Sequence, residues 1–374
     1  MSVRWRDAMD RALYGPGGFF VSGAGPAGHF RTSVHASPAF ASALLRLITS
    51  VDEALRHPPA FAVVDVGAGR GELVRSLAAL LATGVRGEPP PGVAGPPRAT
   101  PVPLAQRVRF TAVELAPRPA GLPEQITWLD EIPAGITGVL LATEWLDNVP
   151  LDLAVPTSEG WRYLLVDPSS GDETVGAPVS GADTAWLTTW WPGPASTQLT
   201  RKHPASIGPG PDENLSTNGE GARAEIGRSR DEAWAAAVSR VERGVAVAVD
   251  YGHLRTGRPM NGTLTGYRGG RQVRPIPDGS CDVTAHVAMD SVAAAGERVA
   301  RCAHSLVSQR EALRALGADG CRPPLSLAAR DPAGYLRALA AASAAAELTD
   351  PAGLGGHRWL LQPVGVAVDP LVAR

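Results

Sequence analysis

The fold of this chain is decided by residues 61–71, Phe61-Ala62-Val63-Val64-Asp65-Val66-Gly67-Ala68-Gly69-Arg70-Gly71. A β-branched run breaks into glycines here, and an amphipathic stretch follows, with apolar residues at Leu73, Val74, Leu77, Leu80 and Leu81. This pattern predicts a strand, a tight turn and a helix. Glycines let a ligand approach the backbone of the turn, and the N–H groups at the start of the helix can bind a carboxylate or a phosphate.

The spacing of these glycines is G-x-G-x-G, because Glu72 stands where a dinucleotide fingerprint has its third glycine. S-adenosylmethionine (SAM) brings an amino acid group to such a turn, whereas a dinucleotide brings a pyrophosphate. The pattern therefore favours SAM, and a nicotinamide oxidoreductase is the weakest alternative. We expect four residues of the turn to bind the cofactor: Asp65, Gly67, Gly69 and Gly71. A turn that binds no ligand, with Asp65 as its structural cap, is the simpler alternative.

Composition bounds the class of protein. The chain has 374 residues, of which 44% are hydrophobic, enough for one large domain with insertions or for two domains. A formal net charge of −2 gives no sign of a nucleic-acid footprint. The cysteines, Cys281, Cys302 and Cys321, are odd in number and lack C-x-x-C spacing, so we expect neither a disulfide framework nor a metal site. No long apolar run predicts a membrane span, and we expect a cytoplasmic protein.

Further strands and helices alternate along the chain. Strands are expected at 108–114, 126–129, 139–144 and 245–250, and helices at 38–56, 231–243, 335–348 and over much of 292–316. Gly244 is expected to end the helix at 231–243. Such alternation predicts an α/β fold with a doubly wound, mostly parallel, Rossmann-like sheet.

The expected domain organisation has two parts. Residues 1–56 form a helical and aromatic lead, and residues 57–374 form the main domain. A Pro/Gly-rich insertion at 84–106 and a cap at about 168–243 interrupt that domain, and residues 201–229 of the cap have the composition of a flexible segment.

Several predicted strands end in an acid: Asp65, Glu114, Glu144 and Asp250. Ligands of doubly wound sheets bind outside the carboxyl ends of the strands, so these acids should meet at one edge. Glu114 is placed to accept both ribose hydroxyls, and Asp130, after the next strand, to reach the adenine amino group. A solvated loop charge is the alternative for both.

The segment Thr143-Glu144-Trp145-Leu146-Asp147-Asn148-Val149-Pro150 places two carboxylates directly beyond a central strand. We predict that Glu144 and Asp147 are catalytic, because a pair of carboxylates can clamp the planar guanidinium of an arginine and accept its proton. Capping of a helix by Asp147, with Glu144 in solvent, is the alternative. The segment lacks the Asn/Asp-Pro-Pro-aromatic tetrad of enzymes that methylate amino groups of bases.

Motifs in a fixed order occur along most of the chain: Leu13–Phe20, Gly28–Ser33, Asp65–Glu72, Val113–Glu114, Glu144–Pro150, Asp250–Gly252, Gly262–Leu264 and Asp282–Val287. Together they resemble the MidA-type SAM-dependent methyltransferases, the family that includes the mitochondrial complex I assembly methyltransferase. The resemblance implies a class I methyltransferase fold, SAM as cofactor and symmetric dimethylation of a protein arginine. The chain departs from the family pattern at His29, at Trp145 and Leu146, and in the insertion at 168–229.

Residues on the substrate side are expected to include Tyr14, Tyr251 and His286, for each of which ordinary packing is the alternative. Two rival functions stay open. One is a small-molecule O- or N-methyltransferase, which an apolar, closed pocket over Glu144 would favour, whereas an open acidic groove would favour a protein substrate. The other is a non-catalytic assembly factor that keeps the fold. A homodimer and a monomer are both open.

Overall fold

The computed structural model describes residues 1–22, 32–83, 102–191, 222–318, 320 and 322–366. Several predictions fall outside this part of the chain. They concern Gly28–Arg31 of the N-terminal motif, residues 84–101 of the Pro/Gly-rich insertion, residues 201–221 of the cap, and Cys321. Cys281 and Cys302, which are described, are free thiols.

The central sheet has the strand order β16-β17-β10-β5-β2-β3-β4. Its strands are β2 (Phe61–Val66), β3 (Val108–Val113), β4 (Ile126–Leu129), β5 (Ile136–Thr143), β10 (Val241–Asp250), β16 (Ser305–Ser308) and β17 (Arg358–Val364). The strands from β10 to β4 are parallel, and β17 runs antiparallel between β10 and β16. In chain order this sheet reads 3-2-1-4-5-7-6, which confirms the predicted doubly wound, mostly parallel α/β fold.

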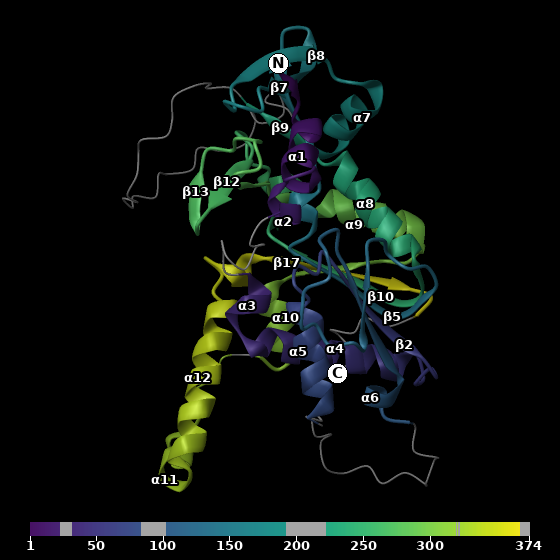
Figure 1. Ribbon diagram of the computed structural model, residues 1–374, viewed down its shortest axis with the longest axis vertical. Coiled ribbons are helices and arrows are strands. Elements are labelled where there is room, and N and C mark those ends of the chain that lie inside the picture. Colours follow the sequence, from purple (N-terminus) through teal and green to yellow (C-terminus); the bar gives the residue numbers. More distant parts are fainter. Residues whose placement is uncertain (23–31, 84–101, 192–221, 319, 321, 367–374) are drawn as a thin grey trace.

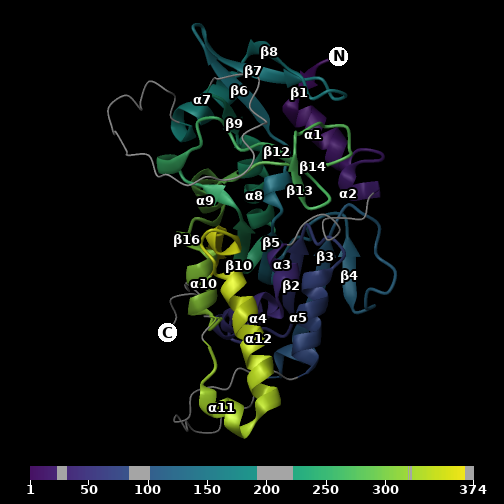
Figure 2. The ribbon, with the colours of Figure 1, turned by 90° about the vertical axis from the view of Figure 1, so that its left-hand side faces the viewer.

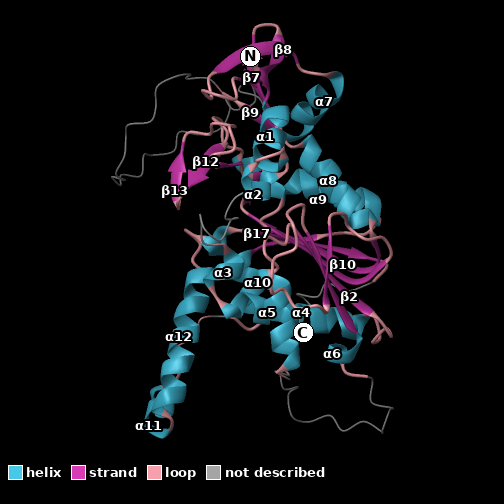
Figure 3. Ribbon diagram, in the orientation of Figure 1, coloured by secondary structure: helices cyan, strands magenta, loops and turns pink. Residues whose placement is uncertain are grey.

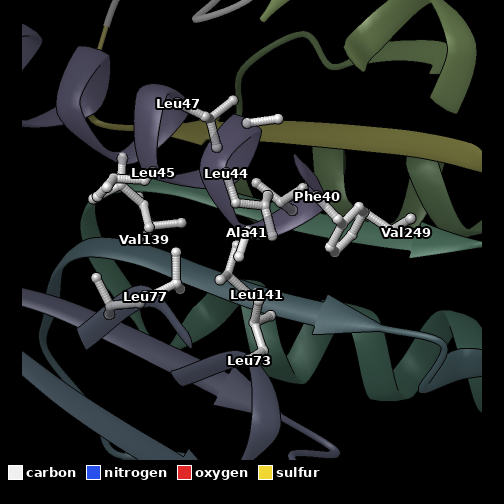
Figure 4. Close-up of a cluster of buried hydrophobic side chains, with 14 of the residues drawn as sticks. Phe40, Ala41, Leu44, Leu45, Leu47, Leu73, Leu77, Val139, Leu141 and Val249 are labelled. Carbon is white, nitrogen blue, oxygen red and sulfur yellow. The ribbon is translucent and has the colours of Figure 1, made fainter. Parts of the chain in front are cut away.

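Helices cover both faces of this sheet (Figures 1 and 3). The helices α4 (Pro38–Ala54), α5 (Glu72–Ala82) and α10 (Gln309–Ala315) pack on one face, and α8 (Arg228–Ser239) and α9 (Met289–Ala300) on the other. Successive strand residues therefore enter different cores, as Val63 and Val64 do. Figure 4 shows the first core, where Phe40 and Leu44 of α4 meet Leu141 and Val249 of the sheet. Burial on both faces explains why these strands are apolar throughout.

A second, antiparallel sheet lies beyond the carboxyl ends of the central strands (Figures 1 and 2). It contains β1 (Val3–Arg4), β6 (Asp152–Thr157), β7 (Gly160–Val166), β8 (Glu173–Pro178) and β9 (Ala224–Ile226). The helices α1 (Trp5–Tyr14), α2 (Phe19–Ser22) and α7 (Gly181–Trp190) accompany it. Trp5, Met9 and Leu13 of α1 share a buried cluster with Leu153 and Leu164 of this sheet. The first residues of the chain are thereby packed against the second sheet. The division of the chain at residue 56 stays a prediction.

Short elements complete the described part of the chain. They are α3 (Ser33–Ala36), α6 (Leu104–Arg107), α11 (Leu325–Arg330), α12 (Pro332–Leu348), β11 (Gly252–His253), β12 (Thr265–Arg268), β13 (Arg271–Val273), β14 (Asp282–Thr284), β15 (Val287–Ala288) and the 3-10 turns η2 (Leu146–Asn148), η4 (Arg255–Gly257) and η5 (Leu354–Gly356). Helix α12 projects away from the second sheet (Figure 2). Within the described residues, no helix has the length and apolar character needed to cross a membrane. The cytoplasmic location stays a prediction.

The prediction for Gly244 was wrong. Helix α8 ends at Ser239, and Gly244 lies inside β10. It has φ 144°, and a Cβ at this position would lie 1.8 Å from the carbonyl oxygen of Gly138 on β5. The glycine is therefore required for the close approach of two strands, and it does not end a helix. The helix expected over much of 292–316 is interrupted, because α9 ends at Ala300, the strand β16 occupies Ser305–Ser308 and α10 begins at Gln309.

Candidate functional site

A cavity of about 410 Å³ opens at the carboxyl ends of β2, β3 and β5. We call it the first cavity, and its volume lies in the range of small-molecule sites. Nine of the predicted site residues line it: Tyr14, Asp65, Gly67, Gly69, Glu114, Asp130, Glu144, Asp147 and Tyr251. Gly71 instead starts helix α5 beneath the turn, and His286 lines a second cavity. The topology thus brings together nearly all residues expected to bind or react.

The glycine turn at the start of α5 requires its glycines. Gly67, Gly69 and Gly71 have φ of 71°, 58° and 78°, in the left-handed region that glycine tolerates best. A Cβ on Gly67 would also lie 2.9 Å from Cδ1 of Trp145. The turn is therefore closely packed against the loop that follows β5, which holds the proposed catalytic residues.

Glu114 faces this turn from the end of β3. Its Oε2 accepts a hydrogen bond from the N–H of Gly69 at 3.0 Å, and its Oε1 accepts one from the N–H of Leu115 at 2.8 Å. Burial raises the pKa of Glu114 while these backbone bonds oppose the shift. Asp130 is exposed at the rim of the same cavity. Both positions agree with an acceptor of hydroxyl or amino hydrogens, although their assignment to ribose and adenine stays a prediction.

Asp65 is buried at the end of β2, with 3% of its surface exposed. Burial, together with the neighbouring charges of Glu72 and Glu114, raises the pKa of Asp65 to about 8. A carboxylate here is costly without a cation beside it, because it is desolvated and repelled. The cavity therefore gains free energy from a ligand that brings a positive group to the glycine turn.

Asp65→Asn is expected to stabilise the protein increasingly as the pH rises. The carboxyl has an ordinary pKa of 3.8 and a folded value of about 8, so between these values the folded chain binds more protons than the unfolded chain. Stability due to Asp65 therefore falls as the pH rises through this window, and asparagine removes the fall. Urea denaturation at pH 5 and pH 8, without ligand, should show a difference between variant and wild type that grows by a few kcal/mol. If the unfolding free energies of variant and wild type differed by the same amount at both pH values, Asp65 would not be a buried group that titrates in this range. Asp7→Asn, at an exposed aspartate, is the control.

Asp147 is held by a network of buried groups. Its Oδ2 accepts hydrogen bonds from the hydroxyls of Tyr251 and of Thr284, the latter at 2.7 Å. Oδ2 of Asp250 accepts bonds from the N–H of Leu146 at 3.0 Å and of Asp147 at 3.3 Å, which fixes the η2 turn. The other carboxyl oxygen of Asp147 is buried and has no hydrogen-bond partner among the residues that the structure describes. Asp147 thus lines the cavity with one oxygen of its carboxyl unsatisfied.

Arg230 of α8 binds the backbone around this turn. It is 1% exposed and donates hydrogen bonds to the carbonyls of Val149 (3.1 Å), Ala285 (2.9 Å) and His286 (3.0 Å), and to that of Asp147. These bonds tie the loop after β5 to the loop between β14 and β15. Arg230 therefore positions both Asp147 and the backbone that carries His286.

Glu144 adopts a rare backbone conformation directly after β5. Its φ is 51°, in the left-handed region, where a residue other than glycine is strained and which is common at functional sites. Its Oε1 accepts a hydrogen bond from the N–H of Ser33 at 2.8 Å. Burial raises the pKa of Glu144 to about 7. A carboxyl with this pKa can both accept and release a proton near neutral pH.

A second cavity, of about 390 Å³, adjoins the first. Glu144 and Tyr251 line both cavities, and Tyr267, His286 and His357 line only the second. Tyr14, by contrast, faces the first cavity, where its hydroxyl lies 3.3 Å from the carbonyl oxygen of Asn148. Of the three residues predicted on the substrate side, Tyr251 alone thus reaches both cavities.

Sequence reasoning missed several residues of the site: Ser33, Arg230, Thr284 and His357. Thr284 lies in the motif Asp282–Val287 but was not singled out. Arg230 immediately precedes the helix predicted at 231, and His357 follows two glycines without any motif. In neither case does the local pattern carry a signal, because their partners are distant in the chain.

The charges around the first cavity decide which ligands fit. Its lining includes Asp10, Asp65, Glu72, Glu114, Asp130, Glu144 and Asp147, against Arg70 and the histidine His35. A pyrophosphate would be repelled here, whereas an ammonium or sulfonium group and a ribose diol would find acceptors. Across the residues that the structure describes, no group of three or more His, Cys, Asp and Glu side chains could hold a metal ion.

Comparisons with known proteins identify the family and the fold. A family model described as "Putative S-adenosyl-L-methionine-dependent methyltransferase" matches residues 41–306. Among solved structures, the fold is similar to a COG1565 superfamily member from Burkholderia thailandensis bound to S-adenosyl-homocysteine, with 23% identity, a TM-score of 0.72 and coverage of 100% of this chain and 91% of the other. A native structure of a COG1565 superfamily protein from Burkholderia thailandensis gives 23% identity, a TM-score of 0.69 and coverage of 100% and 90%. No curated protein matches the chain.

Proposed function

Because this chain belongs to the S-adenosyl-L-methionine-dependent methyltransferase family whose model it matches, we propose that it transfers the methyl group to an arginine side chain of a protein. The cofactor is SAM. The assignment to the MidA-type branch is part of the proposal and rests on the ordered motifs from Leu13–Phe20 to Asp282–Val287. The donor set of the first cavity fits this cofactor, since Asp65 offers a carboxyl to a positive group and Glu114 offers acceptors beside the glycine turn.

One observation carries the choice of acceptor: Glu144 is the acidic residue that lines both cavities. When bound, SAM supplies an electrophilic methyl group and leaves as S-adenosyl-homocysteine. The chain must then orient a nucleophile and remove its proton, because a charged guanidinium is a poor nucleophile. Glu144, with a pKa of about 7, can bind the guanidinium through hydrogen bonds and accept its proton at a carboxyl oxygen. Asp147 lines the first cavity with one carboxyl oxygen that has no partner among the described residues, and it is the second carboxyl that we assign to the acceptor.

A second candidate, methylation of a small molecule at oxygen or nitrogen, is favoured by one feature. The second cavity has the volume of a small-molecule site and is lined by tyrosine and histidine rings. It is neither a closed apolar pocket nor an open acidic groove, so its shape alone does not distinguish a protein arginine from a small molecule as the acceptor. Identification of the methylated product distinguishes these two functions.

Binding of the cofactor tests the first step. Calorimetric titration of the wild-type protein with SAM is expected to show saturable binding to one site. Glu114→Gln should weaken this binding by about 10-fold, since a carboxylate that accepts charge-assisted hydrogen bonds becomes a neutral amide. The exposed variant Glu131→Gln is the control and should bind as the wild type does. If the wild-type protein fails to bind SAM, the proposed function is wrong.

A further inference from the structure

The second cavity has a defined inner and outer end. Glu144 lies at the inner end, where the cavity meets the first, and His286 is an exposed side chain toward its outer end. His357 is 8% exposed, lines the same cavity and lies against Tyr251. The loop that contains Gly353, Leu354 and Gly356 forms another wall. A side chain that enters past His286 would therefore reach the Glu144 carboxyl.

Three rings lie together along this route. The ring of Tyr251 is 5.2 Å from that of His286 and 5.4 Å from that of His357, measured between centroids. Tyr251 is fixed in place because its hydroxyl donates a hydrogen bond to Oδ2 of Asp147 and lies 3.0 Å from the hydroxyl oxygen of Thr284. The face of an aromatic ring can bind a flat cation.

Both histidines favour their uncharged forms. Burial, with the nearby His286, lowers the pKa of His357 to about 4. Desolvation and the nearby His253 lower the pKa of His286, while Glu225 and Asp147 oppose this shift and Arg230 adds to it. The described lining of the second cavity includes neither lysine nor arginine. Glu144, with a pKa of about 7, is thus the acidic group of this cavity, and no described residue of the lining carries a permanent positive charge.

We infer that the second cavity admits the acceptor side chain, and that His286, His357 and Tyr251 select a planar cation over a tetrahedral ammonium. The inference rests on the proposed function, which it deepens by assigning the residues that determine specificity. A guanidinium can lie flat against the rings while its N–H groups reach the Glu144 carboxyl as a fork. An ammonium has the same charge but neither the flat shape nor the fork.

Binding of small cations tests the inference without the chemical reaction. The protein, saturated with S-adenosyl-homocysteine, is titrated with ethylguanidinium and separately with n-propylammonium, and the histidine ring proton resonances are followed by NMR. Ethylguanidinium should shift the resonances of His286 and His357 and bind at least about fivefold more tightly than n-propylammonium. Equal binding of the two cations, or shifts confined to other histidines, would overturn the assignment.

A charge variant sharpens the test. His286→Lys places a permanent positive charge at an exposed position, so the fold should be retained. It should weaken binding of ethylguanidinium by about 10-fold through repulsion of like charges, with S-adenosyl-homocysteine affinity unchanged. His286→Gln adds no charge but lacks the ring, so it should recover part of the affinity while lowering the preference for ethylguanidinium over n-propylammonium. His304→Lys, just before β16 (Ser305–Ser308), is the matched control. Unchanged binding in His286→Lys overturns the inference alone, whereas a wild-type protein that fails to bind S-adenosyl-homocysteine overturns the proposed function.

Discussion

Glu144→Gln is expected to lower the rate of methyl transfer by about 10²–10⁴-fold, the range for loss of a general base, while SAM affinity stays within about threefold of the wild-type value. Glutamine keeps the size of the side chain and can still accept the hydrogen bond from Ser33. It cannot accept a proton from the acceptor nitrogen. The loss should therefore appear in kcat and not in cofactor binding.

The pH profile gives this prediction a second readout. With a pKa of about 7 for Glu144, the wild-type rate should rise as the pH increases through 7, because only the ionised carboxylate acts as a base. The variant should lack this rise. Glu124→Gln, an exposed glutamate outside both cavities, is the control. Wild-type turnover in Glu144→Gln would show that another group removes the proton.

Arg230→Met is expected to destabilise the protein by about 3–5 kcal/mol, the cost of removing one partner from a buried polar network. The carbonyls of Asp147, Val149, Ala285 and His286 would lose a donor, in a region where water cannot replace it. Methionine fills similar volume, so the loss reports the hydrogen bonds more than a cavity. Methyl transfer should also fall, because the η2 turn that contains Asp147 loses its hydrogen bond from the Arg230 side chain.

Urea denaturation measures this change. Arg240→Met at the end of the same helix is a matched control, because Arg240 is exposed, and such surface changes stay within about 0.5 kcal/mol. Equal stability of the two variants would mean that Arg230 does not hold the loops together. Normal stability with reduced transfer would restrict its role to the charge near Asp147.

Local patterns were sufficient to predict the part of the site that one edge of the sheet carries. The run that ends at Asp65, the glycine turn and the acids Glu114 and Glu144 each follow a strand whose apolar residues are contiguous. Parallel strands place their carboxyl ends at the same edge, so the topology brings these residues together without further information. The same reasoning placed Asp147, which follows β5 after a short turn.

Other features depend on contacts between distant segments. Val3 pairs with Val166 in the second sheet, so the first residues of the chain are held above the site although their own pattern shows only an amphipathic helix. His357 reaches Tyr251 from the segment before the last strand. Gly244 resembles a helix stop in the sequence, and only the position of Gly138 on β5 reveals why glycine is needed. Periodicity cannot report such partners.

The most direct test of the account uses radiolabelled SAM. A lysate of the native organism lacking this protein is incubated with labelled SAM and either the wild-type protein or Glu144→Gln, and labelled proteins are hydrolysed to amino acids. The account predicts label in methylated arginine with the wild-type protein and its loss with the variant. Label on a small molecule, on another amino acid, or at equal levels with both proteins would contradict it.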